Sequence, residues 1–222
     1  MHMALTFIPW ILMLSCAGTA PQSVASVPAE KSEEPPSSPS IANSDETPMD
    51  AETAAQLKEI EQICRQVPCR PDTDVQLMVD EERFFQSTVH GSPYVYDGLV
   101  SVLAGEEVHV EGTLDGAGKV IDLQYVPEIV HPSRTISIEF VQTAEGRIHK
   151  SMIMKITSGF EGTLRYSAGI MPVGSADVFG TSTCPIRSGV PVMEMWQDLI
   201  MAIHLTDFHI EDPGDPNAGA CY

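Results

Sequence analysis

The sequence predicts a mainly β fold, namely an antiparallel β-sandwich of the immunoglobulin-like or Greek-key type, preceded by one short amphipathic α-helix. From Val75 onward, apolar residues recur at every second position, which is the period of a strand with one buried face. Several such segments follow one another, and glycine-containing turn signals lie between them. Before them, apolar residues recur at three- and four-residue spacing, which is typical of a helix. A small barrel is the alternative β architecture.

The clearest strand covers residues 135–141, where apolar and polar side chains alternate without interruption. Residues 163–170 repeat this alternation and place Arg165 on the outward, polar face. The Asp97-Gly98 dipeptide is one of the turn signals and favours a tight hairpin.

Two further strands are expected at residues 107–114 and 120–125. Strict alternation places Leu114 on the inner face of the first strand and Ile121 on the inner face of the second. Both side chains are therefore expected in the core.

The C-terminal part combines one long strand with one long irregular segment. Residues 199–210 are apolar on both sides, which suits a central strand, and the parity slips near Thr206-Asp207, which indicates a β-bulge. Residues 173–195 are rich in glycine and proline and are expected to form an irregular loop. Functional residues often lie on such loops.

The N-terminal part divides into a tether and a helix. Residues 16–46 are rich in Pro, Ser and Glu and have no periodic apolar pattern, so they are expected to form a disordered tether. The helix is expected over residues 47–67, with Thr47-Pro48 at its start. Its apolar stripe should dock on the sandwich domain, residues 70–222, and recruitment of a partner is the alternative role.

The first fifteen residues have the features of a signal peptide. An apolar run over residues 4–14 is too short to span a bilayer as a helix, and Ser15 precedes Cys16. The segment resembles the signal peptide and acylation site of bacterial lipoproteins. That resemblance implies a lipid on Cys16, an attachment to the membrane through it, and, because Ala17 follows, the outer membrane of the cell envelope. Cleavage after Ala20 is the alternative and would release a soluble periplasmic or secreted protein.

Four cysteines remain after Cys16, which is an even number in an exported chain, so disulfides are expected. Of the three possible pairings we favour Cys64 with Cys69, which are close in sequence, and Cys184 with Cys221, which would fasten the C-terminus. A zinc site is the alternative, although Cys-x4-Cys is a poor spacing for zinc.

The charge excludes some partners. The chain carries 31 acidic and 12 basic side chains, for a net charge of −19. Nucleic acid and anionic lipid surfaces would be repelled, so neither is an expected partner.

Methionine pairs are candidates for soft-metal binding. Met193 and Met195 lie two apart in the expected loop, and two thioethers can bind copper(I). Met152 and Met154 share a strand face with Ile156 and are expected in the core.

The other candidate metal ligands are pairs of His and acidic residues. Asp207 and His209 should share one strand face, as should His109 and Glu111, but zinc needs a third or fourth ligand. We therefore expect both pairs to lie on an exposed polar face of a strand and not to bind a metal. His204 is expected to be a hydrogen-bonded core histidine.

No motif in the sequence selects a catalytic residue or a cofactor. Gly-x-Ser-x-Gly, phosphate-binding glycine loops and nucleotide fingerprints are absent, and acidic residues are too abundant to single out a glycosidase pair. The expected function is a non-enzymatic binding or structural module of the cell envelope with a possible envelope-protein partner. A periplasmic copper-binding or copper-delivery protein is the alternative, and a small secreted hydrolase is the second alternative.

Overall fold

The computed structural model describes residues 51–215 and 218–221. The expected signal peptide, the lipid-bearing Cys16, the tether and Thr47-Pro48 lie outside these residues. The described chain contains one α-helix, one 3-10 turn and thirteen strands: α1 (Ala51–Cys64), β1 (Thr73–Met78), β2 (Phe84–Val89), β3 (Val95–Tyr96), β4 (Leu99–Leu103), β5 (Glu106–Leu114), β6 (Val120–Val126), η1 (Pro132–Arg134), β7 (Thr135–Glu145), β8 (Ile148–Ser158), β9 (Thr163–Pro172), β10 (Phe179–Thr181), β11 (Ile186–Arg187), β12 (Val192–Trp196) and β13 (Ile200–Ile210).

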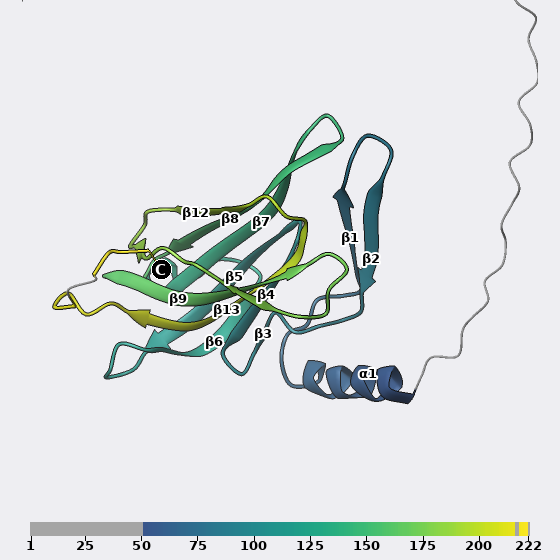
Figure 1. Ribbon diagram of the computed structural model, residues 1–222. Helices are drawn as coiled ribbons and strands as arrows, with labels where there is room; N and C mark the ends of the chain where they lie inside the picture. The colour runs from purple at the N-terminus through teal and green to yellow at the C-terminus, as the bar shows by residue number, and fades with distance from the viewer. Residues whose placement is uncertain (1–50, 216–217, 222) are drawn as a thin grey trace, which may run out of the picture. The chain divides into compact units, whose positions relative to one another are not determined.

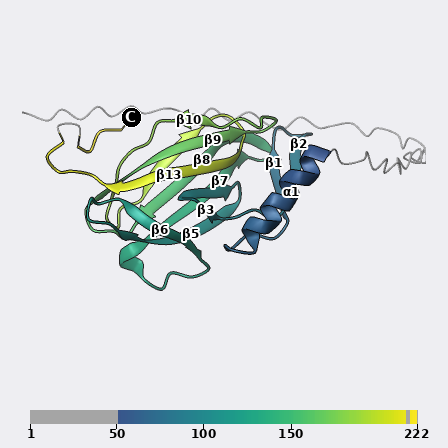
Figure 2. The same ribbon diagram turned by 90° about the horizontal axis from the view of Figure 1, so that it is seen from below.

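Eleven of the thirteen strands form two antiparallel sheets that pack face to face, so the predicted sandwich is confirmed (Figures 1 and 2). One sheet has the order β12-β8-β7-β5-β6. The other has the order β10-β9-β13-β4-β3, with β11 also paired to β9. β13 lies between β9 and β4, which confirms the predicted central C-terminal strand.

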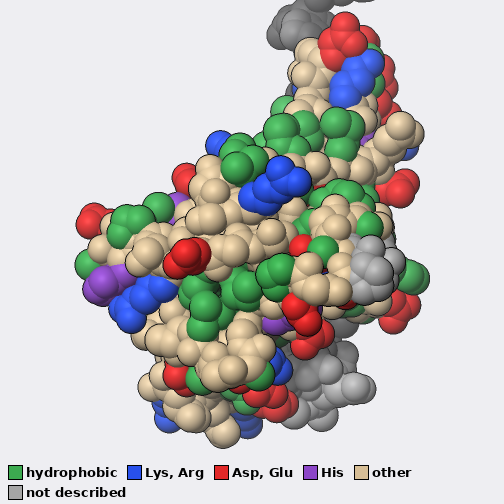
Figure 3. All heavy atoms as spheres, turned by 90° about the vertical axis from the view of Figure 1, so that its left-hand side faces the viewer, with side chains coloured by type: hydrophobic (Ala, Val, Ile, Leu, Met, Phe, Trp, Pro, Cys, Tyr) green, Lys and Arg blue, Asp and Glu red, His purple; other side chains and the backbone are tan. Residues whose placement is uncertain are grey.

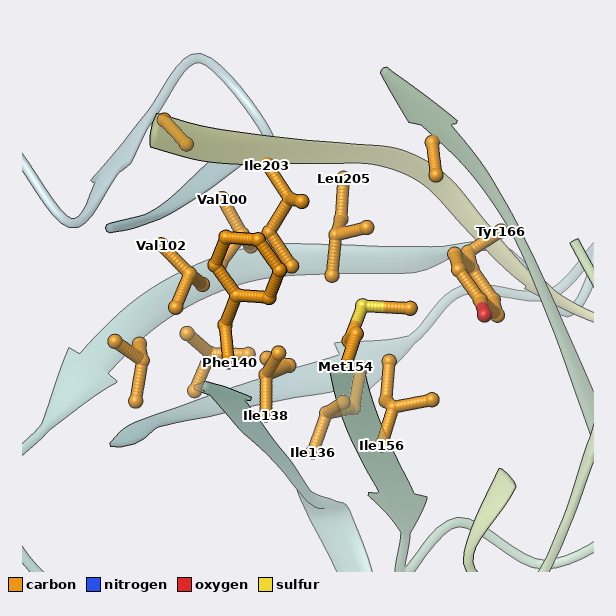
Figure 4. Packing of buried hydrophobic residues seen from close by; sticks show 14 of the residues in the cluster. Val100, Val102, Ile136, Ile138, Phe140, Met154, Ile156, Tyr166, Ile203 and Leu205 are labelled. Atoms are coloured by element: carbon orange, nitrogen blue, oxygen red, sulfur yellow. The ribbon is translucent and has the colours of Figure 1, made fainter. Parts of the chain in front are cut away.

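The core lies between the sheets and is filled by aliphatic side chains with few aromatic rings. Figure 4 shows side chains of β4 and β13 on one side facing those of β7 and β8 on the other, with the Phe140 ring reaching across. Met152 and Met154 are fully buried beside Ile156, as predicted. Burial of this apolar surface is the main favourable term in the folding free energy.

One β-bulge between β5 and β6 overturns part of the predicted core. The β5–β6 pairing shifts between Glu111 and Thr113, and Asp122 adopts a left-handed backbone with φ of 53°. The extra residue of the bulge lies on β6, so the faces that the β6 side chains occupy are reversed on either side of Asp122. Ile121 is therefore exposed, and Leu114, the last residue of β5, is exposed as well, both contrary to the prediction.

The predicted bulge in β13 is present. The β13–β9 register shifts between Thr206 and His209, and Asp207 has φ of 55°.

Arg165 also differs from its predicted position, because its side chain is buried. Its guanidinium forms an ion pair with Glu211, and Nη1 donates to the carbonyl oxygen of Ala220 at 2.7 Å. The C-terminal segment thus covers a charge that alternation alone places outside. The Cys184–Cys221 disulfide, as predicted, fastens this segment to the domain.

The β1–β2 hairpin forms a separate two-stranded sheet that docks through a glutamine side chain. Oε1 of Gln142 accepts from the Met78 backbone N–H, and Nε2 donates to the Met78 carbonyl, both at 2.8 Å. Nε2 also contacts Nδ1 of His149 at 2.8 Å, and the other ring nitrogen bonds to the Gln197 carbonyl. The amide therefore acts as one additional peptide unit beside β1.

The predicted helix is present as α1, and the predicted Cys64–Cys69 disulfide joins its last residue to the domain. Leu57 and Ile60 are half-buried and line a shallow groove with His90 and Gly91. The apolar stripe therefore faces the end of the domain near the β1–β2 hairpin, where Figure 2 shows α1, without entering the core.

The segment 173–195 is more regular than predicted. It contains β10, β11 and β12, each of five residues or fewer and separated by glycine- and proline-containing turns. Short strands of this length give too few alternating positions to be recognised in the sequence.

Gly159 is required by a close approach of the backbone. A Cβ atom there would lie 1.6 Å from the carbonyl oxygen of Pro132, whereas one at Gly116 would have no atom within 4 Å. We expect Gly159→Ala to lower the free energy of unfolding by on the order of 3 kcal/mol, because rigid backbone must move. Gly116→Ala should leave it nearly unchanged. Urea unfolding of both variants tests this; equal midpoints would contradict it.

Candidate functional site

A tight hairpin between β3 and β4 builds the rim of a groove. Asp97 and Gly98 have φ of 49° and 76°, as a two-residue type I′ turn requires, so the predicted turn at this dipeptide is present. The turn pairs Tyr96 with Leu99 across the hairpin and leaves them 49% and 36% exposed. An aromatic and an aliphatic side chain thus stand together at the surface.

The groove beside this hairpin has a volume of about 480 Å³. Its walls come from the hairpin, from the preceding loop and from the neighbouring strand β13: Ser92, Pro93, Tyr96, Asp97, Leu99, Ser101, His204 and Thr206. His204 pairs with Ser101 across the β13–β4 ladder, so residues about a hundred positions apart share the floor. The lining is mainly apolar, with a few polar groups, as is usual for small-molecule sites of this size.

A buried arginine fixes the floor. The Arg70 side chain is completely buried, and Nε donates to Oε1 of Glu106 at 2.9 Å. Nη1 donates to Oγ of Ser92 and Nη2 to the Ser101 carbonyl, both at 2.7 Å. Two residues of the groove wall are therefore held by one guanidinium, whose charge is balanced by Glu106.

Two tyrosines complete this support. The Arg70 guanidinium lies over the Tyr94 ring, 4.6 Å from its centroid, which is within cation–π range. Tyr94 stacks on Tyr125 of the opposite sheet, with the centroids 3.9 Å apart. Burial is the main cause that raises the pKa of Tyr94, so its hydroxyl stays neutral. The arrangement joins the two sheets beneath the groove.

His204 differs from the predicted, fully hydrogen-bonded core histidine. Its Nδ1 is buried and has no hydrogen-bond partner among the described residues. Burial, and then the positive charge of Arg70, lower the pKa of the imidazole. The ring is therefore neutral near pH 7.

A second candidate surface is formed by β12, the terminal strand of its sheet. Met193 and Met195 point outward and are 64% and 65% exposed. Glu194 points inward and accepts from the Cys184 backbone N–H at 2.8 Å, and Trp196 Nε1 donates to Oγ1 of Thr181 at 3.0 Å. The inner face of β12 is thus fastened to the loop beneath it, while the outer face is free.

Charged and apolar groups alternate on the end of the domain that faces left in Figure 1. Figure 3 shows this end: hydrophobic side chains form several separate groups between acidic and basic ones. In Figure 1 β12 lies beside β8, at the end of its sheet. Because β12 is the terminal strand of its sheet, an interaction there would use the narrow edge of that strand.

The predicted histidine–acid pairs are not brought together as ligand pairs. Asp207 and His209 are both exposed, but Nδ1 of His209 bonds to the backbone carbonyl of Asp207 at 2.8 Å. His109 contacts Oγ of Ser137 instead of Glu111. Within residues 51–215 and 218–221, no group of three or more His, Cys, Asp or Glu residues is placed to hold a metal ion.

Glu111 is buried, contrary to its expected outward position. Burial raises its pKa, but hydrogen bonds from the backbone and ring of His131, together with Arg134, outweigh this and hold the pKa below its usual value. The carboxylate thus fastens the loop that leads into β7.

Comparisons with known proteins gave no match: no protein-family model, curated protein or solved structure resembles the chain. Of the helices in the described part, none is long and apolar enough to cross a membrane. The two disulfides indicate an oxidising compartment outside the cytoplasm.

Sequence reasoning did not identify Arg70, Tyr96 or Leu99. Arg70 directly follows Cys69, and the predicted disulfide of Cys69 was the one indication in the sequence that this residue is held against the domain. The Asp97-Gly98 turn could have indicated that its flanking residues form a cross-strand pair.

The buried arginine gives a direct test of the groove floor. We expect Arg70→Met to lower the free energy of unfolding by about 3 kcal/mol or more, because Glu106 loses its charge partner. Arg83→Met removes an exposed ion pair with Asp80 and should leave unfolding nearly unchanged. Chemical denaturation of the two variants measures the difference. Similar stabilities would contradict the assigned role of Arg70.

His204 gives a pH-dependent test. Because its pKa is lowered in the folded state, the unfolded chain binds a proton more readily below the unfolded pKa of about 6.5. Protonation of His204 in the unfolded chain therefore lowers the free energy of unfolding as the pH falls through about 6.5 toward the folded pKa. We expect His204→Phe to raise the free energy of unfolding by about 1 kcal/mol at pH 7.5 and by more at pH 5.5. Urea unfolding at both pH values checks this, and an equal change at both would contradict it.

Proposed function

We propose that this protein is an exported, lipid-anchored and non-enzymatic module that holds another protein of the cell envelope through strand β12. The lipoprotein-like segment ending at Cys16 supports the anchor, and the two disulfides support export. The residues 16–46 would serve as the tether between the anchor and the domain.

The observation that carries this proposal is the unguarded edge of β12. Natural proteins protect edge strands with lysine, proline, bulges or covering segments. In β12 the one charged side chain, Glu194, is turned inward to Cys184, and the outward residues are two methionines. Pro191 precedes the strand but leaves its five residues free of proline.

At Met195 the neighbouring strands extend this apolar edge into a row, whereas Met193 pairs with Lys155 of β8. Met195 pairs with Ile153 of β8, and Ile153 pairs with Val141 of β7, so the three side chains lie in register on the outer face. A partner strand added to β12 would continue the sheet through backbone hydrogen bonds and place alternate apolar side chains beside this row. The net charge of −19 favours basic residues at the other positions of the partner.

The exposed thioethers of Met193 and Met195 also support a second candidate function, the binding of copper(I). Two soft ligands on one face are available to a metal, and methionine suits copper(I). The two functions differ in what they require: strand addition needs an apolar, uncharged edge, whereas copper needs sulfur.

A pair of double variants separates the functions. Met193→Lys with Met195→Lys places charges on the edge and should abolish specific crosslinks to the envelope partner in intact cells. Met193→Leu with Met195→Leu keeps the edge apolar and should retain them, while it would abolish copper(I) binding in a titration of the purified protein. Cys16→Ser serves as the anchor control and should weaken crosslinking. Crosslinks that survive the lysine substitutions would contradict the assigned surface.

A further inference from the structure

The groove between Tyr96 and His204 lies on the other sheet and plays no part in the proposed β12 contact. We propose that it binds a small organic cation, with an ammonium group at Tyr96 and Asp97 and an apolar body along the floor.

The charge of the lining favours a cation. Asp97 is the one acidic residue among those that line the groove, and none of them is lysine or arginine. Arg70, beneath the floor, is neutralised by Glu106, and His204 is uncharged near pH 7. An anionic ligand would meet Asp97 and the field of a protein with a net charge of −19.

The position of the ammonium group follows from the hairpin. Tyr96 is half-exposed, Asp97 follows it directly in the turn, and both residues line the groove. An aromatic ring and a carboxylate at one end of a groove attract an ammonium group through cation–π and Coulomb interactions. A smaller hollow of about 280 Å³ adjoins the groove through Asp97 and Thr206 and contains Lys119. The Lys119 charge disfavours a cation there, which leaves the Tyr96 end as its place.

The size and stiffness of the groove set the rest of the ligand. A volume of about 480 Å³ suits a small molecule, and Pro93 and Leu99 offer apolar contacts for its carbon atoms. Arg70 fixes the Ser92 and Ser101 walls, and the two-residue turn fixes Tyr96. A preformed site of this kind loses little entropy when the ligand binds.

Choline and phenyltrimethylammonium are suitable probes, and 3,3-dimethyl-1-butanol is the neutral isostere of choline. We expect calorimetry on the purified full-length protein in detergent to show both cations binding with Kd below roughly 10 mM, at least tenfold tighter than the alcohol. Affinity for the cations should fall with added salt.

Substitutions then locate the ammonium group. Asp97→Asn retains a residue that tolerates the left-handed turn and should weaken cation binding at least fivefold, and Tyr96→Leu should weaken it at least tenfold. Phe84→Leu, a change at another exposed aromatic residue, should have no effect. Thermal unfolding of each variant verifies that the fold is retained.

Four results would overturn the proposal. These are no binding of either cation at that concentration, equal affinity for choline and its neutral isostere, unchanged affinity in both Asp97→Asn and Tyr96→Leu, and preferential binding of glucose as a neutral polyol.

Discussion

The burial of the Arg70 charge is the constraint on which this end of the molecule depends. A guanidinium is tolerated in the interior only when its charge is balanced and its donors are bonded, and Glu106, Ser92 and the Ser101 carbonyl meet those needs. These partners come from separate strands and loops, so the same contacts that satisfy the charge also fix the β3–β4 hairpin. The adjacent Cys69 carries the disulfide to α1. The contacts that satisfy one buried charge therefore also hold two walls of the groove in place.

The sequence allowed the sandwich to be predicted because burial of one face imposes a two-residue period on long strands such as β7. The sequence also indicated the bulge in β13, because the two-residue alternation of apolar side chains changes phase at Thr206-Asp207 and apolar residues lie on both sides of it. The bulge between β5 and β6 could not be seen in the sequence, because Leu114 and Ile121 are apolar although exposed and so preserve an apparent alternation. Pattern alone cannot distinguish an apolar residue that is buried from one that is not.

The candidate sites were less predictable, because they depend on pairings between distant segments. His204 meets Ser101 only through the β13–β4 ladder, and Met193 and Met195 face outward because β12 pairs with β8 in one register. The methionine pair itself is visible in the sequence, whereas its exposure is not. Arg70 and Tyr96 belong to residue types found on most surfaces, and only the fold assigns one to the interior and the other to a groove.

Both surfaces include groups that folding alone would disfavour. The buried Nδ1 of His204 lacks a partner among the described residues, and two large apolar side chains on β12 remain in water. The unpaired imidazole nitrogen lowers stability relative to a phenylalanine at position 204. The exposed methionines lower solubility relative to lysine residues on β12. Features of this kind are expected at functional or strained sites. The surroundings of both are held by disulfides and buried hydrogen bonds, so recognition at either surface would require little rearrangement of the backbone.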